Sequence, residues 1–239
     1  MKLIVLGMNG PFPESDRACS GYLLSAGDSL LQFDFGSGVL SRLTALTAPE
    51  ELTALFLSHW HYDHTGDLLT LIYRLEAVGM KLKLFAPADE SSPVFRIVSS
   101  LPCFELCTVK PGDMLELSGD ITVRVGEARH PVTAVMYRVE QNGKVFCYTG
   151  DTNTLPGLAD FCMNADLLLA DGLFTDELWT PEKPHLSARL ASQLSVDAHA
   201  GKLILTHLNP FIDPQTLLAQ AREVRKDVLL AVPGMKAVL

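Results

Sequence analysis

The sequence predicts an α/β fold in which one core of two β-sheets lies between helices. Short apolar runs typical of buried strands precede stretches with helical spacing in both halves of the chain. Hydrophobic residues make up 48% of the chain and charged residues 20%, which provides enough apolar surface for a large core. No low-complexity segment or long linker interrupts the 239 residues, so we expect residues 1–239 to form a single domain. One two-sheet core with helices outside both sheets accommodates this order better than two independent domains.

In the first half, strands are expected where apolar residues run between turns. The expected strands are LIVLG (3–7), YLLSA (22–26), LLQFDFG (30–36), LTALFLS (52–58) and KLKLFAP (81–87). The run 52–58 is almost continuously apolar, as in a strand buried on both faces. The segment after His64 has leucines at helical spacing, and Thr65 or Asp63 is expected to cap this helix. Residues 88–100 are expected to form a further helix.

The second half begins with hairpins and then alternates strands with helices. Strands are expected within LELSGDITVRVGEARH (115–130) and at 134–140, 144–151, 165–171, 202–207 and 228–232. Gly119-Asp120 and Asn142-Gly143 supply hairpin turns. Helices are expected at 186–199, where leucines form one stripe, and at 214–225.

Charge and cysteine content set limits on partners and location. The net charge of −9 argues weakly against a nucleic-acid groove built on bulk positive charge. The five cysteines are odd in number and lack the spacing of a disulfide framework, so we expect reduced, mostly buried thiols. The apolar run before Gly7 is too short for a signal peptide, and no later run approaches membrane-spanning length. These features predict a cytoplasmic protein without membrane association.

Six expected strands each end in an imidazole or a carboxylate. These residues are Asp34, His59, His130, Asp151, Asp171 and His207. Strand ends in a layered fold can converge on one rim, so residues far apart in the chain become neighbours. The sequence therefore predicts one polar site built from several strand ends.

The segment SHWHYDH gives this site the chemistry of a metal centre. His59, His61 and Asp63 share parity, so an extended chain would aim them the same way, and His64 is offset toward a second ion. Imidazole and carboxylate ligands suit Zn, Mn or Fe. We expect two divalent ions, with Zn the first choice. The alternative for an isolated histidine pair is an ordinary polar loop, and the further histidines and aspartates at other strand ends argue against it.

These residues carry a family resemblance. SHWHYDH resembles the HxHxDH signature of the metallo-β-lactamase superfamily, and ARH, YTGDT and LTHLNP resemble its later metal motifs in the right order. The resemblance extends over essentially the whole chain and implies a four-layer αββα sandwich with a binuclear metal site at one edge. It assigns His59, His61 and His130 to one ion, and Asp63, His64 and His207 to the other, with Asp151 bridging. Asp34, in FDFGSG, would lie behind the ligating histidines and orient them.

Two further segments resemble the branch that contains ribonuclease Z and related phosphodiesterases. PHLSARLAS places His185 before a helix, and LLLADGLF places Asp171 at a strand end. The resemblance implies that a metal-bridging hydroxide attacks phosphorus and that His185, oriented by Asp171, protonates the leaving oxygen. Asp63 would hold and orient the nucleophilic water. His199 matches no motif and is expected to be structural or solvated.

The sequence also departs from ribonuclease Z. That enzyme carries a tRNA-gripping arm between the third metal histidine and the bridging aspartate, but only one hairpin fits between His130 and Asp151 here. The Pro-x-Lys-x-Arg-Asn pattern of its N-terminal loop reads PESDRA, with Ser15 and Ala18 at the Lys and Asn positions. The His-Glu-Ala-Thr stretch reads ADGL at 170–173. We therefore expect a small phosphodiester substrate, such as a cyclic nucleotide, cyclic phosphate or short oligonucleotide.

Three alternatives to this function stay open on the sequence. The first is a tRNA 3′-processing endonuclease, although nucleic acid is not the favoured substrate. The second is a carbonyl hydrolase of the same fold, such as a lactonase or thioesterase, because its metal ligands overlap heavily. The third is a non-catalytic protein that binds a phosphorylated ligand through Arg17, Arg129 and Lys183, which are also candidate substrate-binding residues for the enzyme. The branch resemblance also implies a homodimer.

Overall fold

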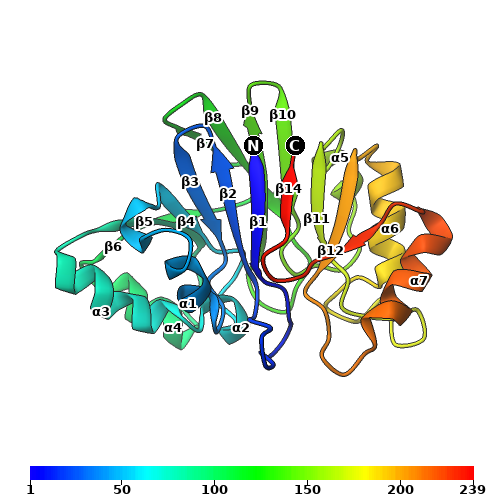
Figure 1. The fold of residues 1–239 in the computed structure, drawn as a ribbon, viewed down its shortest axis with the longest axis horizontal. Coiled ribbons are helices and arrows are strands. Elements are labelled where there is room, and N and C mark those ends of the chain that lie inside the picture. The colour runs from blue at the N-terminus through cyan, green and yellow to red at the C-terminus, as the bar shows by residue number, and fades with distance from the viewer.

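A computed structural model describes residues 1–239 and arranges them as two seven-stranded sheets packed face to face (Figure 1). The first sheet has the order β14 (Lys236–Val238), β1 (Lys2–Gly7), β2 (Gly21–Ala26), β3 (Ser29–Phe33), β4 (Ala54–Phe56), β5 (Leu82–Pro87) and β6 (Phe104–Val109). The second has the order β13 (Leu229–Leu230), β12 (Lys202–Thr206), β11 (Leu167–Asp171), β10 (Lys144–Tyr148), β9 (Val135–Gln141), β8 (Ile121–Glu127) and β7 (Met114–Leu117). Both sheets mix parallel and antiparallel pairs.

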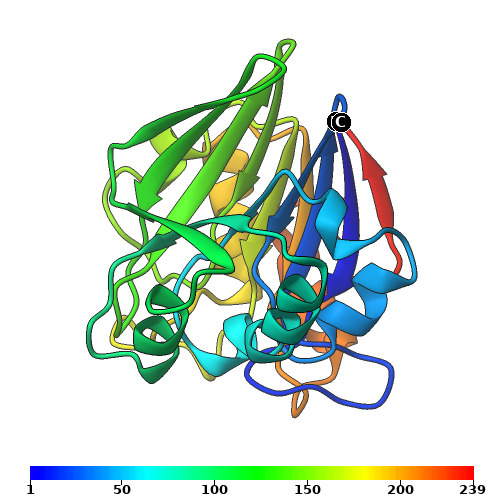
Figure 2. The same ribbon diagram turned by 90° about the vertical axis from the view of Figure 1, so that its left-hand side faces the viewer.

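Helices complete the four layers. Those beside the first sheet are α1 (Val39–Thr44), the 3₁₀ turn η1 (Pro49–Glu51), α3 (Leu68–Val78) and α4 (Pro93–Ser99) (Figures 1 and 2). Those beside the second are α5 (Leu158–Phe161), α6 (Ala188–Asp197) and α7 (Pro214–Val224). The remaining helix, α2 (Tyr62–Thr65), is a single turn at the lower edge in Figure 1. The predicted αββα sandwich is confirmed.

Local boundaries differ from the sequence expectations in three places. The expected strand 52–58 pairs only over Ala54–Phe56, because the chain then leaves the sheet toward the histidine segment. The expectation that Thr65 or Asp63 caps the following helix is wrong: both lie inside α2, and Asp67 is the N-cap of α3. The expected helix 88–100 begins only at Pro93, where Ser92 accepts a hydrogen bond from the Phe95 amide.

Several elements were not expected from the sequence. These are α1, η1, α2, β6, α5 and β14. All are short, and β6 and β14 are edge strands of the first sheet. A short edge strand is defined by pairing with one distant neighbour, as β14 pairs with β1, so its own residues carry little signal.

Aromatic side chains fill the space between the sheets beneath the candidate site. Phe33 is fully buried and its ring lies 5.1 Å from that of Phe56 and 5.5 Å from that of Phe146. Phe33 directly precedes Asp34, so the packing that holds this ring also fixes the end of β3. The core between the sheets therefore supports the edge where the polar residues lie.

We expect Phe33→Ala to lower the free energy of unfolding by about 3–5 kcal/mol, because it removes a buried ring and leaves a cavity. Urea denaturation monitored by circular dichroism measures this change. Phe211→Ala is the control, because the Phe211 side chain is 85% exposed and its loss is expected to cost much less. Equal effects of the two substitutions would contradict the role given to Phe33.

Strand direction brings the polar residues to one edge. β3 runs parallel to β4, and β10, β11 and β12 run parallel to one another. β8 has the same direction as β10, because β9 is antiparallel to both. The carboxyl ends of these strands therefore point to the same edge of the sandwich, and the residues that follow them can meet.

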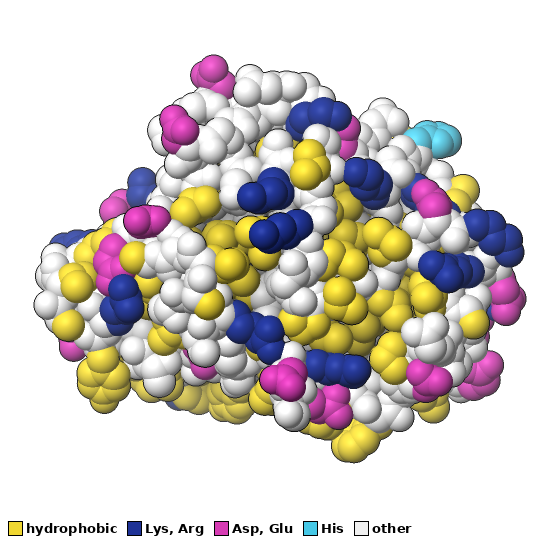
Figure 3. Space-filling view, in the orientation of Figure 1, with side chains coloured by type: hydrophobic (Ala, Val, Ile, Leu, Met, Phe, Trp, Pro, Cys, Tyr) yellow, Lys and Arg dark blue, Asp and Glu magenta, His cyan; other side chains and the backbone are white.

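The surface and cysteines agree with a folded protein of mixed surface charge. All five cysteines are free thiols and four of them are buried. None of the helices has the length and apolarity that crossing a bilayer requires. On the face in Figure 3, Lys and Arg side chains lie around an apolar area, while Asp and Glu lie mostly toward the margins. On this face, the basic and acidic side chains are thus unevenly distributed.

Candidate metal centre

Three histidines form the first part of the site. His59 and His61 lie on the loop after β4, and His130 lies on the loop after β8. The Nδ1 atom of His61 lies 3.0 Å from His59 Nε2 and 3.0 Å from His130 Nε2. Three ring nitrogens that face one another at these distances form a group that can hold a metal ion.

A second group adjoins the first and consists of Asp63, His64, Asp151 and His207. The Oδ2 atom of Asp151 lies 3.2 Å from the Nε2 atoms of both His64 and His207. The same oxygen lies 3.6 Å from His59 Nε2 in the first group. Asp151 therefore stands between the two groups, the place that the family resemblance gives to a bridging ligand.

Burial and charge in this cluster fit a divalent ion. His64 Nε2 and Asp151 Oδ1 are buried atoms with no hydrogen-bond partner, an arrangement that is costly unless another group satisfies them. Burial holds the pKa of His59 and of His207 well below the usual range and lowers that of His130 to about 4. Their imidazoles are thus neutral near pH 7, as metal ligation requires.

The surroundings of His64 are strongly negative. Burial alone would lower the pKa of this imidazole, but the nearby carboxylates, Asp151 foremost, raise it well above the usual range. Burial raises the pKa of the Asp63 carboxyl to about 6. A cation placed among these carboxylates would be stabilised by the same negative charge. The set of nitrogen and oxygen donors therefore suits Zn, Mn or Fe, as predicted.

The route by which the histidine segment reaches this geometry differs from the expected one. The argument from the parity of an extended chain is wrong for Asp63, because the chain is extended only as far as His61, the N-cap of α2. Asp63 and His64 are consecutive residues of the helical turn, and both face the second group. Helical geometry, rather than strand alternation, brings them together.

Backbone conformation at two strand ends also shapes the site. Asp34 and His207 both adopt positive φ angles, 51° and 55°. This left-handed conformation is uncommon for residues other than glycine and is concentrated at functional sites. Gly10 lies against His207, because a Cβ atom there would come within 2.1 Å of the imidazole. The N-terminal loop thus closes on the His207 ring where only glycine fits.

Asp34 organises the residues behind the cluster. Its Oδ2 atom accepts hydrogen bonds from Tyr148 Oη at 2.6 Å and from Ser58 Oγ at 2.8 Å, and it lies 2.7 Å from His64 Nδ1. The Ser58 amide donates to Oδ1 at 2.7 Å. Because Nδ1 of His64 is held in this way, its Nε2 faces the site. Sequence reasoning found Asp34 but missed Ser58 and Tyr148, whose only signal is that they are the first residues of the SHWHYDH and YTGDT motifs.

We expect Asp34→Asn to weaken metal affinity about 10–100-fold, because the amide would present a donor where His64 needs an acceptor. Competition with a chromogenic chelator measures the affinity. The control is Asp28→Asn, which changes the charge equally at an exposed turn between β2 and β3, far from the cluster edge. Unchanged affinity in Asp34→Asn would show that Asp34 does not position the ligand.

His185 and Asp171 form a buried pair beside the cluster. Asp171 ends β11, and its Oδ2 atom lies 2.8 Å from His185 Nδ1. The His185 ring lies 5.2 Å from that of His130 and 5.0 Å from that of His207. Burial disfavours protonation of His185, but the charge and hydrogen bond of Asp171 outweigh it and raise the pKa of the imidazole to about 9. The structure thus brings together the two residues that were predicted to act as acid and orienting group.

The candidate substrate-binding residues lie at the surface. Lys183 places its Nζ 5.5 Å from the centroid of Phe174, and that ring in turn contacts His185. Arg129 donates to the carbonyls of Thr154 and Pro181, so its guanidinium is already engaged. Arg17 pairs with Glu14 in the N-terminal loop. His199 is exposed just after the end of α6, in agreement with the expectation that it is structural or solvated. Substrate binding by these three basic residues stays a prediction.

An αββα sandwich with a cluster of histidines and aspartates at one edge defines the metallo-β-lactamase class of fold. The Beta-lactamase superfamily domain matches residues 28–208, which include every residue of the cluster. A probable metallo-hydrolase, YhfI from Bacillus subtilis, is 31% identical over 94% of this chain and 93% of its own length. This chain belongs to the β-lactamase superfamily.

Other relatives agree with this assignment. A ribonuclease Z from Methanosarcina acetivorans is 25% identical over 97% of this chain and 95% of its own length. The crystal structure of YhfI superposes with a TM-score of 0.92 over 99% of this chain and 98% of its own, at 30% identity. Human tRNase Z, short form, has the same fold, with a TM-score of 0.81 at 18% identity over 100% of this chain and 99% of its own. The predicted superfamily, its ribonuclease-Z-like relatives and the prediction of a hydrolytic enzyme are confirmed; the homodimer stays a prediction.

Proposed function

We propose that this protein is a binuclear metal-dependent phosphodiesterase that acts on small phosphodiesters, with Zn as its metal. The observation that carries the proposal is the buried Asp171–His185 pair beside the histidine and aspartate cluster. Attack on a phosphodiester expels an alkoxide or aryloxide, and an alkoxide departs readily only when it receives a proton. A carbonyl hydrolase of this fold attacks carbon and transfers no phosphoryl group. It therefore does not need the Asp171–His185 pair as the acid for a phosphoryl leaving group.

The residues of the cluster divide the work between binding and proton transfer. His59, His61 and His130 would hold one ion, Asp63, His64 and His207 the other, and Asp151 both. When bound, the ions would supply Lewis acidity and a water of lowered pKa. Asp63 would accept a hydrogen bond from the nucleophilic water and orient it. His185 would donate its Nε2 proton to the leaving oxygen, because Asp171 already binds Nδ1 and fixes the ring.

The short connection from His130 to Asp151 favours a small substrate over tRNA. The chain between them is filled by β9 and β10, which are joined at a tight turn between Gln141 and Lys144. No separate arm projects from this hairpin to hold a large RNA. The name of the ribonuclease Z relative supports phosphodiester chemistry for this chain, and the lack of an arm argues for a different substrate size.

A substrate panel on protein loaded with defined Zn or Mn tests the proposal. It contains bis(p-nitrophenyl) phosphate, 3′,5′- and 2′,3′-cyclic nucleotides, a tRNA precursor and a lactone. We expect turnover of small phosphodiesters above that of the lactone and the tRNA. Preferred cleavage of the lactone, or efficient processing of the tRNA precursor, would overturn the proposal. Binding of phosphorylated ligands without any turnover would favour a non-catalytic role.

A further inference from the structure

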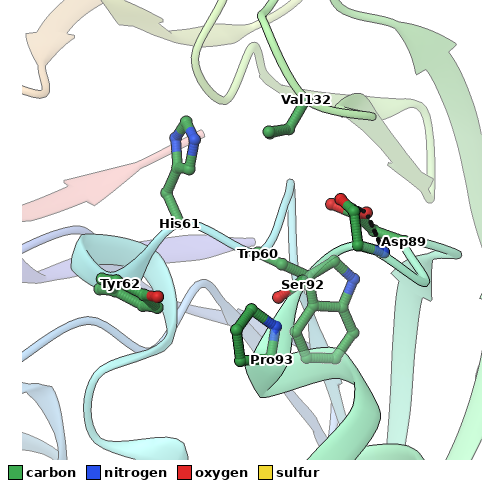
Figure 4. Close-up of a pocket in the computed structure, with 8 residues that line it drawn as sticks. Trp60, His61, Tyr62, Asp89, Ser92, Pro93 and Val132 are labelled. Carbon is green, nitrogen blue, oxygen red and sulfur yellow. Dashed lines mark hydrogen bonds between the residues drawn. The ribbon is translucent and has the colours of Figure 1, made fainter.

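A small cavity opens directly beside the metal centre. It has a volume of about 240 Å³, and His61 is the residue that it shares with the cluster. Figure 4 shows Tyr62 on one side, Asp89 on the other, and Trp60, Ser92 and Pro93 between them, with Val132 near His61. The volume is below the ~300–1,000 Å³ that is usual for drug-sized ligands, so the cavity suits one ring system rather than an extended molecule.

The walls of this cavity are held in place by contacts outside it. Trp60 is buried, donates from Nε1 to the Pro87 carbonyl at 2.7 Å, and packs edge-on against Phe95 at 5.3 Å. Ser92 caps α4 and is thereby fixed. The Tyr62 side chain is 67% exposed, so one face of its ring is free for a ligand. A rigid floor and an open aromatic wall are suited to a planar group.

Asp89 determines which planar group fits. It is the only acidic residue of the lining, and no Lys or Arg lines the cavity. Its Oδ1 atom accepts hydrogen bonds from the amide and hydroxyl of Ser91, which fixes the carboxylate and leaves Oδ2 as an acceptor. A carboxylate without a neighbouring cation repels phosphate and attracts N–H donors.

We propose that this cavity is a nucleobase subsite, in which Asp89 accepts a hydrogen bond from an exocyclic amino group of the base and Tyr62 covers the ring. The substrate class is therefore a phosphodiester of an amino-bearing nucleoside. The inference rests on the proposed function, because the phosphate is expected at the adjacent metal centre. The cavity itself contributes no charge that would bind the phosphate.

Two nucleotides that differ by one amino group test the subsite on zinc-loaded protein. Adenosine 5′-monophosphate and purine riboside 5′-monophosphate are used as inhibitors of bis(p-nitrophenyl) phosphate hydrolysis, and their dissociation constants are measured by calorimetry. We expect the adenosine compound to bind about tenfold more tightly, as for one hydrogen bond to a charged acceptor. Asp89→Asn is expected to bring the ratio of the two constants close to one, because the amide replaces the free acceptor by a donor while its oxygen can still bind Ser91.

Controls separate this inference from the proposed function. Asp28→Asn makes the same charge change at a distant turn and is expected to keep the wild-type ratio. Turnover of bis(p-nitrophenyl) phosphate is expected to stay within about twofold in Asp28→Asn, which lies far from both the cavity and the cluster. Equal binding of the two nucleotides by the wild type, or an unchanged ratio in Asp89→Asn, would overturn the subsite. Absence of all phosphodiester turnover would instead overturn the proposed function, while calorimetry would still report the ratio.

Discussion

Asp151→Ala is expected to lower kcat/KM by about 10³-fold or more and to reduce the metal content of the protein below two ions per chain. The reason is the position of its carboxylate, whose Oδ2 lies within 3.6 Å of His59 Nε2 and 3.2 Å of both His64 Nε2 and His207 Nε2. Bound metal contributes several kcal/mol to transition-state stabilisation, and each 1.36 kcal/mol corresponds to tenfold in rate. Elemental analysis and kcat/KM on bis(p-nitrophenyl) phosphate measure the two effects.

The control for this substitution is Asp166→Ala. Asp166 lies just before β11, at the end of that strand away from the cluster. Its Oδ1 atom lies 2.7 Å from Lys144 Nζ. We expect this variant to keep two ions and nearly full activity, because the ion pair is partly exposed and such pairs contribute little. If Asp151→Ala kept two ions per chain and its activity, Asp151 would not be a bridging ligand.

His185→Ala is expected to reduce turnover in a way that depends on the leaving group. For a cyclic nucleotide, which releases an alkoxide, we expect a fall in kcat of about 10²–10⁴-fold, the usual contribution of a positioned acid. For bis(p-nitrophenyl) phosphate the fall is expected to be much smaller, because p-nitrophenolate departs without a proton. Metal content is expected to stay at two ions, since His185 is not one of the seven expected ligands and its Nδ1 lies 2.8 Å from Asp171 Oδ2.

Two further variants define what the His185 result means. His199→Ala removes an exposed histidine and is expected to leave both substrates unaffected. Asp171→Asn removes the charge behind His185 and is expected to give an intermediate loss with the same dependence on the leaving group. Equal losses on both substrates in His185→Ala, or a loss of metal, would show that His185 supports the site structurally and is not the proton donor.

The sequence was informative about the cluster because its signals are local. Four of the seven expected ligands lie within SHWHYDH, and each of the others follows an apolar run that ends at the same edge. The two positions between the ligands differ in burial: Trp60 is buried and packs against Phe95, and Tyr62 lies exposed at the rim of the site. Residue types and their distance from strand ends were sufficient to predict which side chains would meet.

Other features depended on contacts that no local pattern reports. The roles of Ser58 and Tyr148 follow from the hydrogen bonds that each donates to Asp34. Asp34 follows β3, whereas Ser58 follows β4 and Tyr148 ends β10. The cavity beside His61 is built from three separate loops, after β4, β5 and β8, and nothing in any one loop predicts the others. Edge strand β14 exists because β1 is available to pair with it.

By itself, the sequence determined a two-sheet core with helices outside and a polar site at strand ends, because apolar periodicity and ligand spacing are properties of neighbouring residues. The resemblance of its motifs to the metallo-β-lactamase superfamily added the αββα sandwich, the expected ligand set and the Asp171–His185 pair. The tertiary structure decided which ring nitrogen of each histidine faces the cluster, what holds Asp34, and which side chains surround the cavity. These depend on the pairing order of strands and on loop packing, where residues distant in the chain set one another's positions. The carboxylate of Asp89, unremarkable in the sequence, gains its proposed role only from its place in the cavity that it lines together with His61, on the side opposite Tyr62.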